Sequence, residues 1–490
     1  MHRTPARRRI DLVRIATDAM TERGLEPEFG AAVMAQLATI GGPGSDADTR
    51  IADLRSMPWC SIDNDDSRDL DQLTACEPLA AGAVKIFVAV ADVDVLVGKG
   101  SAIDDHARFN TTSVYTAARI FPMLPERLST DLTSLNPGQE RLAIVTTMVV
   151  GADASITQAT VMRARVHNKA KLAYDALAVW IDGQGVLPAA AAAVPGLDAQ
   201  LRTQDAVAQR LRVRRHAEGA LEFETLQPRA VYEGERVVEI RQQVQNRARQ
   251  LIEELMIATN RATAQFLAEQ GAASLRRVVR SPERWQRIVA EARKYGETLP
   301  KQPDSRALEG FLARRRTADP LRFPDLSLVI VKLMGSGEYV VEQSGAAPIG
   351  HFGLAVRDYT HSTAPNRRFP DLVTLRLLKA VLASREPPYS GAELTALAAH
   401  CSQQEDAAQK VERKLRKCEA ALLLESHVGQ RYEAIVTGRN DHNAWVRTLS
   451  PPVEGMLTGR SPELEIGQRV EVRLVSADVE RGFIDFEFLH

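Results

Sequence analysis

The chain has 490 residues, which is enough for two to four domains around a large core. Its hydrophobic content of 44%, charged content of 26% and net charge of −1 are ordinary for a globular protein and exclude a generally basic surface. If the protein binds nucleic acid, it must therefore do so through local basic patches.

Cysteine usage and the N-terminal sequence favour a cytoplasmic protein. The four cysteines form no CxxC pair, so the spacing of a zinc knuckle is missing and reduced thiols are expected. The basic start MHRTPARRRIDL is not followed by the apolar core of a secretory signal. No stretch approaches 18 consecutive apolar residues, so we expect no membrane span and no membrane partner.

The first 55 residues are expected to form a small helical module. Apolar residues recur at helical spacing in RIDLVRIATDAMTERG (9–24) and in PEFGAAVMAQLATI (27–40). The following GGPGSDAD is typical of a linker. A helix-turn-helix-like arrangement is one form that such a module can take.

From about residue 56 the pattern changes to strands. Three β-branched stretches, at 85–97, 141–153 and 155–170, predict strands of one sheet. The alanine-rich LPAAAAAVPG (187–196) is expected to be a spacer between elements. Helical periodicity then dominates from about 199 to 300 and is clearest over 245–271.

Arginine-rich helices are predicted next. Residues 275–294 hold seven basic and two acidic side chains, and residues 306–316 end in three consecutive arginines. These arginines could line a channel for a phosphate backbone, although a solvated helix face is the ordinary alternative for each of them. Further helices are predicted at 372–384 and 392–425.

The last 65 residues are expected to form a separate five-stranded barrel of the OB type. Five short strand-like runs are separated by turns near residue 440, at Gly459 and at Gly467. From 431 to 490 there are seven arginines, no lysines and ten carboxylates, so bulk charge cannot attract nucleic acid. A local face around Tyr432 and Trp445 would have to bind it. The expected fold class is thus α+β: a mixed-sheet domain (56–425) between the helical module (1–55) and the barrel (426–490).

A run of aspartates breaks the ordinary charge balance. SIDNDDSRDLDQL (61–73) holds five of them: Asp63, Asp65, Asp66, Asp69 and Asp71. Carboxylates that converge on one point are costly unless they are protonated or neutralised by cations. Mg²⁺ prefers such oxygen ligands, and a pair of Mg²⁺ ions can assist phosphodiester displacement.

Three other interpretations compete for this run on the residues alone. An EF-hand loop that begins at Asp63 would need glycine at its sixth position and glutamate at its twelfth, but Arg68 and Thr74 stand there. A solvated acidic loop is the ordinary alternative, because runs of like charge are usually exposed. A structural calcium loop of another kind also remains open.

Longer motifs point toward one family. They are PWCSIDNDDSRDLDQLT, VAVADVDVLVGKGSAIDDHARFNTTSVY, FPMLPERLSTDLTSLNPGQERLA, ARQLIEELMIATNRA and GHFGLAVRDYTHSTAPNRRFPDLVTLRLLKA. In these motifs the chain resembles the ribonuclease II / ribonuclease R (RNB) family of 3′-to-5′ exoribonucleases, over about residues 56–490. The terminal barrel resembles the S1-type RNA-binding domain of the same enzymes.

The resemblance implies a hydrolase with an RNB catalytic domain, in which helices surround a mixed sheet. Such an enzyme threads single-stranded RNA into a channel and processively releases nucleoside 5′-monophosphates from the 3′ end. The cofactor implied is Mg²⁺, as one or two ions, with Mn²⁺ as an alternative. The expected partner is single-stranded RNA, and we expect the protein to be a monomer.

The resemblance also implies a metal site. Asp63, Asp69 and Asp71 match its carboxylates, Asp69 and Asp71 with a catalytic role, and Asp71 is the one most closely tied to cleavage. Asp66 falls on a less uniform position and ranks below them. Gln72 departs from the aspartate that usually follows Asp71, so it could offer a metal one carbonyl oxygen but no charge.

Other positions match residues that touch RNA. Arg367 matches a catalytic arginine that contacts the phosphate near the scissile bond, and Arg368 stands beside it in the same motif. Tyr115 matches a tyrosine that packs on the terminal nucleotide. Glu419 is assigned to a glutamate near that nucleotide, and Trp445 is the RNA-binding candidate of the barrel.

Two departures keep a second function open. Besides Gln72, the loop APNRRF (364–369) differs from the usual serine–proline–isoleucine–arginine–arginine–tyrosine, although its proline and both arginines remain. The alternative is an RNA-binding or regulatory protein whose nuclease site has decayed. Bacterial members often carry two cold-shock-type barrels before the catalytic domain, for which 55 residues leave no room, so a smaller RNA entrance is expected.

Overall fold

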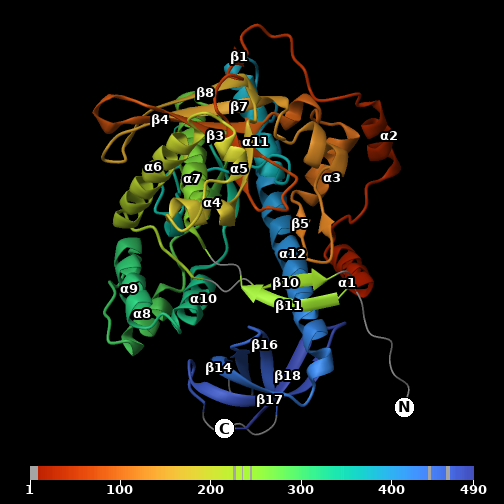
Figure 1. The fold of residues 1–490 in the computed structure, drawn as a ribbon, viewed down its shortest axis with the longest axis vertical. Helices are drawn as coiled ribbons and strands as arrows, with labels where there is room; N and C mark the ends of the chain where they lie inside the picture. The colour runs from red at the N-terminus through yellow and green to blue at the C-terminus, as the bar shows by residue number, and fades with distance from the viewer. Residues whose placement is uncertain are drawn as a thin grey trace.

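The computed structural model describes residues 9–224, 228–233, 236–242, 245–343, 345, 347–439, 443–458 and 464–489. A larger α/β body stands above a small barrel, and one long helix, α12 (Gly391–Leu424), runs from the body down to the barrel (Figure 1). No helix in these ranges has the length and apolarity needed to cross a membrane.

A seven-stranded mixed sheet forms the centre of the body, in the order β1-β8-β7-β4-β3-β2-β9. Its strands are β1 (Ala52–Asp53), β2 (Cys60–Asp63), β3 (Gln72–Pro78), β4 (Val84–Ala91), β7 (Glu140–Val150), β8 (Ile156–His167) and β9 (Ala170–Ala173). The three strands predicted from β-branched alternation are β4, β7 and β8, which are consecutive and antiparallel in this sheet.

Both faces of the sheet are covered, and β4 shows how. Val84, Ile86, Val88 and Val90 point into one core with α4 (Tyr174–Ile181), α6 (Leu197–Ala217) and α7 (Arg247–Glu269). Phe87, Ala89 and Ala91 point into the opposite core with α3 (Ala102–Asn110), α11 (Phe369–Leu382) and α12. Alternating residues of an extended strand face opposite sides, so a strand buried on both sides must be apolar at nearly every position.

The predicted helical stretch from 199 to 300 also contains strands. The hairpin of β10 (Pro228–Glu233) and β11 (Arg236–Gln242) precedes α7, and β12 (Ser274–Val278) pairs with β13 (Glu338–Glu342). A helix beginning at residue 275 was therefore the wrong expectation. Leu275 and Val278 are buried, and Pro282 prevents one continuous helix, which starts only at Trp285. The alanine-rich spacer contains the short helix α5 (Ala189–Ala192).

The two N-terminal helices belong to different cores. Helix α1 (Arg9–Glu22) packs on the lower part of α12, whereas α2 (Ala31–Thr39) packs on α3. This differs from the helix-turn-helix-like module considered above. Arg14 of α1 also binds Glu480, in the turn between the last two barrel strands, at 2.7 Å. The N-terminal segment therefore braces the body and the barrel.

Three helices form a subdomain with its own core. They are α8 (Trp285–Lys294), α9 (Ser305–Ala318) and α10 (Phe323–Met334), and we call residues 281–334 the helical subdomain. Its core is built from Trp285, Ile288, Leu308, Phe311, Phe323 and Ile330, among others. It lies beside the barrel, on the side away from α1 (Figure 1).

The C-terminal residues form a closed five-stranded barrel in the order β14-β15-β16-β18-β17, which confirms the predicted architecture. Its strands are β14 (Arg431–Arg439), β15 (Ala444–Thr448), β16 (Glu454–Thr458), β17 (Arg469–Asp478) and β18 (Phe483–Phe488). Of the predicted turns, those near residue 441 and at Gly459 lie outside the described residues. Gly467 does form a turn, with a φ of 86° that favours glycine.

Candidate active site

The aspartate run lies between β2 and β3 and is divided by burial. Asp63 ends β2, and Asp71 immediately precedes β3 and is only 2% exposed. Asp63 and Asp69 are partly buried, whereas Asp65 and Asp66 are exposed. The three aspartates that the sequence ranked highest are thus the three that face the interior, and Asp66 lies on the solvent side.

Asp71 is held by the arginine loop. Arg367 Nε donates to Asp71 Oδ2 at 2.8 Å, and the backbone N–H of Asn366 donates to Oδ1 at 3.2 Å. Burial raises the pKa of Asp71 to about 7, while Arg367 opposes that shift. The Arg367 side chain remains 41% exposed, so its outer nitrogens can still reach a ligand.

Tyr115 connects the aspartate run to α12. Its hydroxyl donates to Asp69 Oδ2 at 3.0 Å, and its backbone N–H donates to Glu412 Oε1 at 3.0 Å. The residue as a whole is 38% exposed, and a stacking surface must be accessible. The segment before Tyr115 also contacts the arginine loop, because the Ser113 N–H donates to the carbonyl of Arg367 at 3.0 Å. This hydrogen bond holds Arg367 beside Tyr115.

Glu412 is a residue that the sequence analysis missed. Glu419, which was assigned to this region, lies two turns further along α12 and is buried, next to Cys418, whose thiol contacts the carbonyl of Glu480 in the barrel. The two glutamates are seven residues apart and therefore share a helix face, so helical periodicity cannot tell them apart. In the structure Glu412, and not Glu419, accepts the hydrogen bond from the backbone N–H of Tyr115.

Arg368 points away from Asp71. It pairs with Asp371, in the first turn of α11, at 2.7 Å. Asp371 also accepts from the backbone N–H of Ala364 at 2.8 Å, which closes the loop onto the helix. The neighbouring arginines thus differ in role, since Arg367 faces the aspartates and Arg368 stabilises the loop that carries it.

The charges around Asp71 suit a divalent cation. Burial raises the pKa of Asp63, and repulsion by Asp69 raises the pKa of both Asp63 and Asp71, so Asp69 lies close enough to act on each of them. The ligand atoms of the three carboxylates do not all lie within 4.8 Å of one another. Arg367 is the cation that acts on them, which leaves an excess of negative charge. Gln72, the first residue of β3, is 9% exposed and adds no charge. This donor set fits Mg²⁺ or Mn²⁺.

A second cluster is less suited to a metal. Within the described part of the chain, His216, Glu222 and Glu309 alone offer three ligand atoms that all lie within 4.8 Å of one another. Glu222 is already paired with Arg316, at 2.6 Å, and with Arg212. The arginines balance the two carboxylates, so no excess negative charge remains for an ion.

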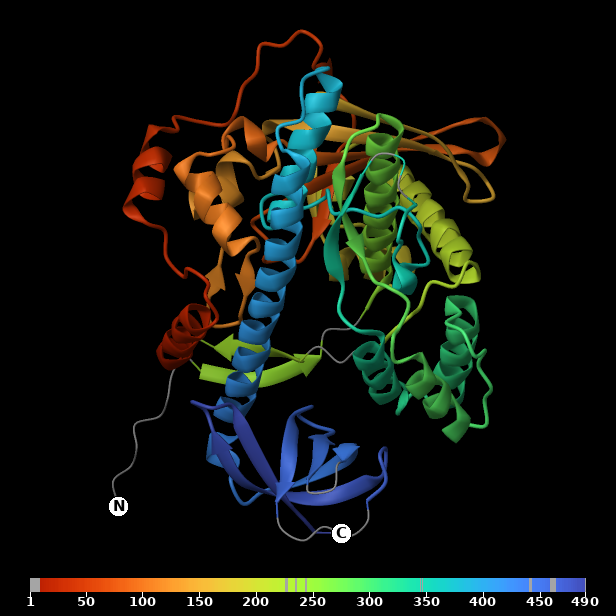
Figure 2. The same cartoon turned by 180° about the vertical axis from the view of Figure 1, so that it is seen from behind.

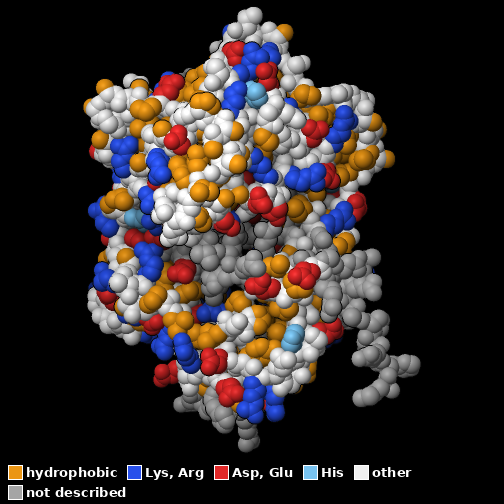
Figure 3. All heavy atoms as spheres, viewed as in Figure 1, with side chains coloured by type: hydrophobic (Ala, Val, Ile, Leu, Met, Phe, Trp, Pro, Cys, Tyr) orange, Lys and Arg blue, Asp and Glu red, His pale blue; other side chains and the backbone are white. Residues whose placement is uncertain are grey.

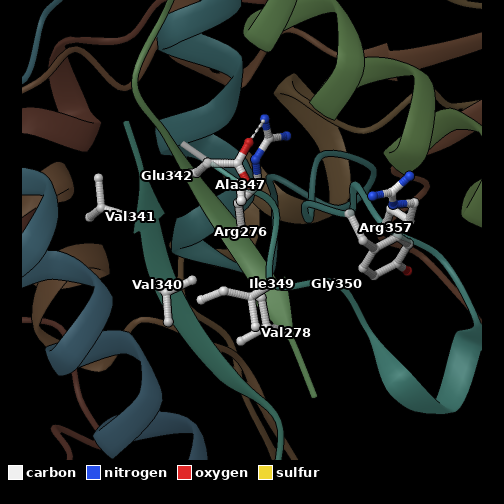
Figure 4. A pocket seen from close by; sticks show the side chains of 10 residues that line it. Arg276, Val278, Val340, Val341, Glu342, Ala347, Ile349, Gly350 and Arg357 are labelled. Atoms are coloured by element: carbon white, nitrogen blue, oxygen red, sulfur yellow. Dashed lines mark hydrogen bonds and ion pairs between the residues drawn. The ribbon is translucent and has the colours of Figure 1, made fainter. Parts of the chain in front are cut away.

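Two of the arginines expected to line a channel are instead committed to the protein. Arg276 is buried and donates to Glu342 at 2.8 Å, beside a cavity of about 110 Å³ between the β12–β13 pair and the loop around Arg357 (Figure 4). Arg277 forms a bidentate pair with Glu405 of α12. Both arginines lie on β12 and not on a solvated helix face. Their ion pairs attach this strand to β13 and to α12.

The barrel candidate Trp445 lies on an outward face. Along β15 the residues alternate between buried and partly exposed, and Trp445 and Arg447 are on the partly exposed side. Arg447 forms an ion pair with Asp325 of α10 at 2.6 Å. Trp445 is therefore placed beside the junction of the barrel and the helical subdomain, far along the chain from the aspartate run.

Comparison with known proteins adds family evidence to this geometry. The model of the RNB domain matches residues 51–384, and that of the RNase II-type exonuclease C-terminal S1 domain matches residues 430–489. The chain belongs to the RNB family. Ribonuclease R of Escherichia coli K12 is 30% identical over 89% of this chain and 57% of its own length. Ribonuclease R of Vibrio cholerae is 29% identical, with the same two coverages.

These curated relatives are longer, and this RNB-family chain spans 57% of their length. Among solved structures, Mycoplasma genitalium RNase R in complex with ribose-methylated single-stranded RNA superimposes with a TM-score of 0.87 at 21% identity, over 98% of this chain and 78% of the other. Yeast Ssd1, a pseudonuclease, superimposes with a TM-score of 0.72 at 16% identity, over 94% of this chain and 57% of Ssd1. At these identities the likeness establishes the RNB fold, which both a ribonuclease and a pseudonuclease adopt.

Proposed function

We propose that this RNB-family chain is a metal-dependent 3′-to-5′ exoribonuclease that hydrolyses single-stranded RNA to nucleoside 5′-monophosphates. The observation that carries the proposal is the buried Asp71, held by Arg367 at 2.8 Å and close enough to Asp69 for that carboxylate to raise its pKa. Relatives named ribonuclease R, at 28–30% identity, support the same activity.

In this mechanism Asp63, Asp69 and Asp71 would hold Mg²⁺, and Gln72 would offer at most a neutral oxygen. The ion would supply positive charge for the scissile phosphate and for activation of a water molecule. The residues of this chain then do the positioning. Arg367 uses its outer nitrogens to grip the phosphate and stabilise the charge that develops on it.

The terminal nucleotide would be held by Tyr115. Base–aromatic stacking stabilises binding by roughly 1–3 kcal/mol per base and accepts every base, as a degradative enzyme requires. The hydrogen bond from the Tyr115 hydroxyl to Asp69 fixes the ring relative to the metal ligands. Recognition of the 3′ end and metal binding are therefore linked by a single contact.

A product analysis tests this function. A 5′-labelled single-stranded RNA of about 30 nucleotides, incubated with the protein and Mg²⁺, should shorten stepwise to a small limit product while 5′-monophosphates accumulate. EDTA should stop the reaction, and added Mg²⁺ should restore it, because the carboxylates cannot replace the ion's charge. A matched 2′-deoxy oligonucleotide is the control for RNA selectivity. Intact RNA across Mg²⁺ and Mn²⁺ would contradict the proposal.

The second candidate function is RNA binding by a decayed site, and Gln72 is the observation that favours it. The substitution Gln72→Asp adds a carboxylate beside Asp71 and should increase metal affinity, so that the half-saturating Mg²⁺ concentration falls severalfold. Calorimetric titration with Mn²⁺ gives a readout that does not depend on turnover. Gln72→Asn, which is as short as aspartate but neutral, is the matched control. If Gln72→Asp gains activity that the wild type lacks entirely, the decayed-site function is favoured.

A further inference from the structure

The N-terminal residues make contacts that membership of the family does not explain. The matching RNB model begins at residue 51, so α1, α2 and the chain between them lie outside the matched region. We call residues 23–30, which join the two helices, the N-terminal connector. It packs on the part of the body that carries Tyr115, and its role has to be inferred from those contacts.

Tyr115 is carried by a very short hairpin. Strand β5 (Val114–Tyr115) pairs with β6 (Ile120–Phe121) over two residue pairs. Tyr115 and Ile120 are exposed on one side, whereas Val114 and Phe121 are 0% and 3% exposed on the other. An isolated two-stranded hairpin is at best marginally stable, so whatever covers its inner side fixes the position of Tyr115.

The N-terminal connector supplies part of that cover. Leu25 is 3% exposed and shares one core cluster with Val114, Phe121 and apolar residues of α1 and α12. In Figure 1 the hairpin lies between α3 and α1, alongside α12. Glu28 binds Arg119, in the turn of the hairpin, at 2.6 Å, and the Arg119 guanidinium lies 4.7 Å from the centre of the Phe121 ring. The connector thus contacts both the inner side and the turn of the hairpin.

A second set of contacts leads from the connector to Arg367. The backbone N–H of Glu26 donates to Asn110 Oδ1, and the carbonyl of Glu26 accepts from Asn110 Nδ2, both at 2.8 Å. Asn110 is 3% exposed and is the last residue of α3. The chain continues from it to Ser113, whose N–H donates to the carbonyl of Arg367. The connector is therefore bonded to the segment that contacts the arginine loop.

The two links differ in their exposure to solvent. The Glu28 and Arg119 side chains are 66% and 33% exposed, and an exposed ion pair contributes little to the stability of the whole protein. In Figure 3, acidic and basic side chains lie next to one another along the right side of the molecule, where Figure 1 places α1, α2 and α3. Reversal of the Glu28 charge should therefore disturb the hairpin without unfolding the protein.

We propose that the N-terminal connector is a positioning element of the candidate active site. Glu28 acts through Arg119 to hold the hairpin where Tyr115 can stack on the 3′-terminal nucleotide, and the buried contacts of Asn110 align the segment beside Arg367. The connector itself does not touch RNA. This inference rests on the proposed exoribonuclease function and gives the N-terminal residues a role at the 3′ end of the substrate.

Charge reversal tests the link to Tyr115. In an Asp71→Asn background with Mg²⁺, a 3′-terminal 2-aminopurine in a hexanucleotide RNA should lose fluorescence when it stacks on Tyr115. Glu28→Arg should weaken binding of this RNA about fivefold and reduce the quenching at saturation. The double substitution Glu28→Arg with Arg119→Glu restores opposite charges and should recover most of both. In otherwise wild-type protein, Glu28→Arg should raise KM for the same RNA while kcat changes little, because stacking is equally strong in the ground state and the transition state.

Asn110→Ala tests the link to Arg367. It removes both hydrogen bonds to Glu26 and should lower kcat for the hexanucleotide severalfold, with a smaller change in KM, because Arg367 stabilises charge that develops only in the transition state. Asn110→Asp retains an acceptor for the Glu26 N–H and should recover part of kcat. An unchanged kcat in Asn110→Ala would contradict this link.

Glu22→Arg is the matched control for Glu28→Arg. Glu22 pairs with Lys414 of α12 at 3.1 Å, with nearly the same exposures, 62% and 32%, but it lies outside the connector. Equal losses of quenching in the two variants would overturn the inference in favour of a general weakening of the N-terminal residues. Unchanged quenching and KM in Glu28→Arg, in a protein whose wild type shortens RNA, would overturn this inference alone. If wild-type protein neither binds nor shortens RNA, the proposed function fails, and this inference fails with it.

Discussion

Asp71→Asn should reduce kcat for RNA hydrolysis by about 10³-fold or more while RNA binding is retained. The amide has nearly the same size as the carboxylate, so the contacts to Arg367 and Asn366 can persist in part, but the charge needed for Mg²⁺ is lost. The measurement is a single-turnover time course on 5′-labelled RNA, with binding followed by fluorescence anisotropy.

Stability should not explain that loss. Asp71 is buried, and burial of a charge is costly, so removing the charge should change the unfolding temperature only slightly. Asp65→Asn, in the same run but exposed, is the control and should be fully active. If Asp71→Asn retains activity within tenfold of wild type, Asp71 is not a metal ligand in the reaction and the mechanism above is wrong.

Arg367→Lys should lower kcat/KM by about 10²-fold. Lysine keeps the positive charge but cannot hold Asp71 through one nitrogen and grip phosphate through two others, as the planar guanidinium can. Steady-state kinetics on a short RNA, with the metal dependence recorded for both proteins, would measure the effect.

The adjacent arginine provides the contrast. Arg368→Lys weakens the ion pair with Asp371, in which the arginine donates at 2.7 Å, and should lower the unfolding temperature more than it lowers kcat/KM at a permissive temperature. Equal kinetic effects of the two substitutions, at equal stability, would show that the structure's division of roles between Arg367 and Arg368 is mistaken.

Local sequence patterns were sufficient to predict elements whose surroundings in the fold are of one kind along their whole length. The β-branched, apolar composition of residues 85–97 predicted a strand, and the structure forms β4 there, with both of its faces buried. The aspartate run predicted a carboxylate site; Asp71 is buried and Asp63 and Asp69 are partly buried, but their role as metal ligands stays a prediction.

The failures occurred where a distant partner decides the outcome. The sequence of residues 274–278 is typical of an arginine-rich helix. These residues form a strand because β13 pairs with them and its Glu342, 66 residues further along the chain, binds Arg276. Glu412 and Glu419 are equivalent on a helical wheel, and only the position of β5 (Val114–Tyr115) across α12 distinguishes them. Long-range pairing of this kind is not encoded in local periodicity.

The length of α12 has a consequence of its own. This helix of 34 residues spans about 51 Å, and it contacts α1, the Tyr115 strand, the β10–β11 hairpin and the barrel in turn (Figure 2). It therefore sets the distance between the candidate active site and the barrel. Insertion of one residue after Glu412 would turn the barrel by about 100° and move it by about 1.5 Å, whereas a seven-residue insertion would nearly restore the phase at a greater distance. Evolutionary change in the reach of this molecule should therefore occur in whole heptads.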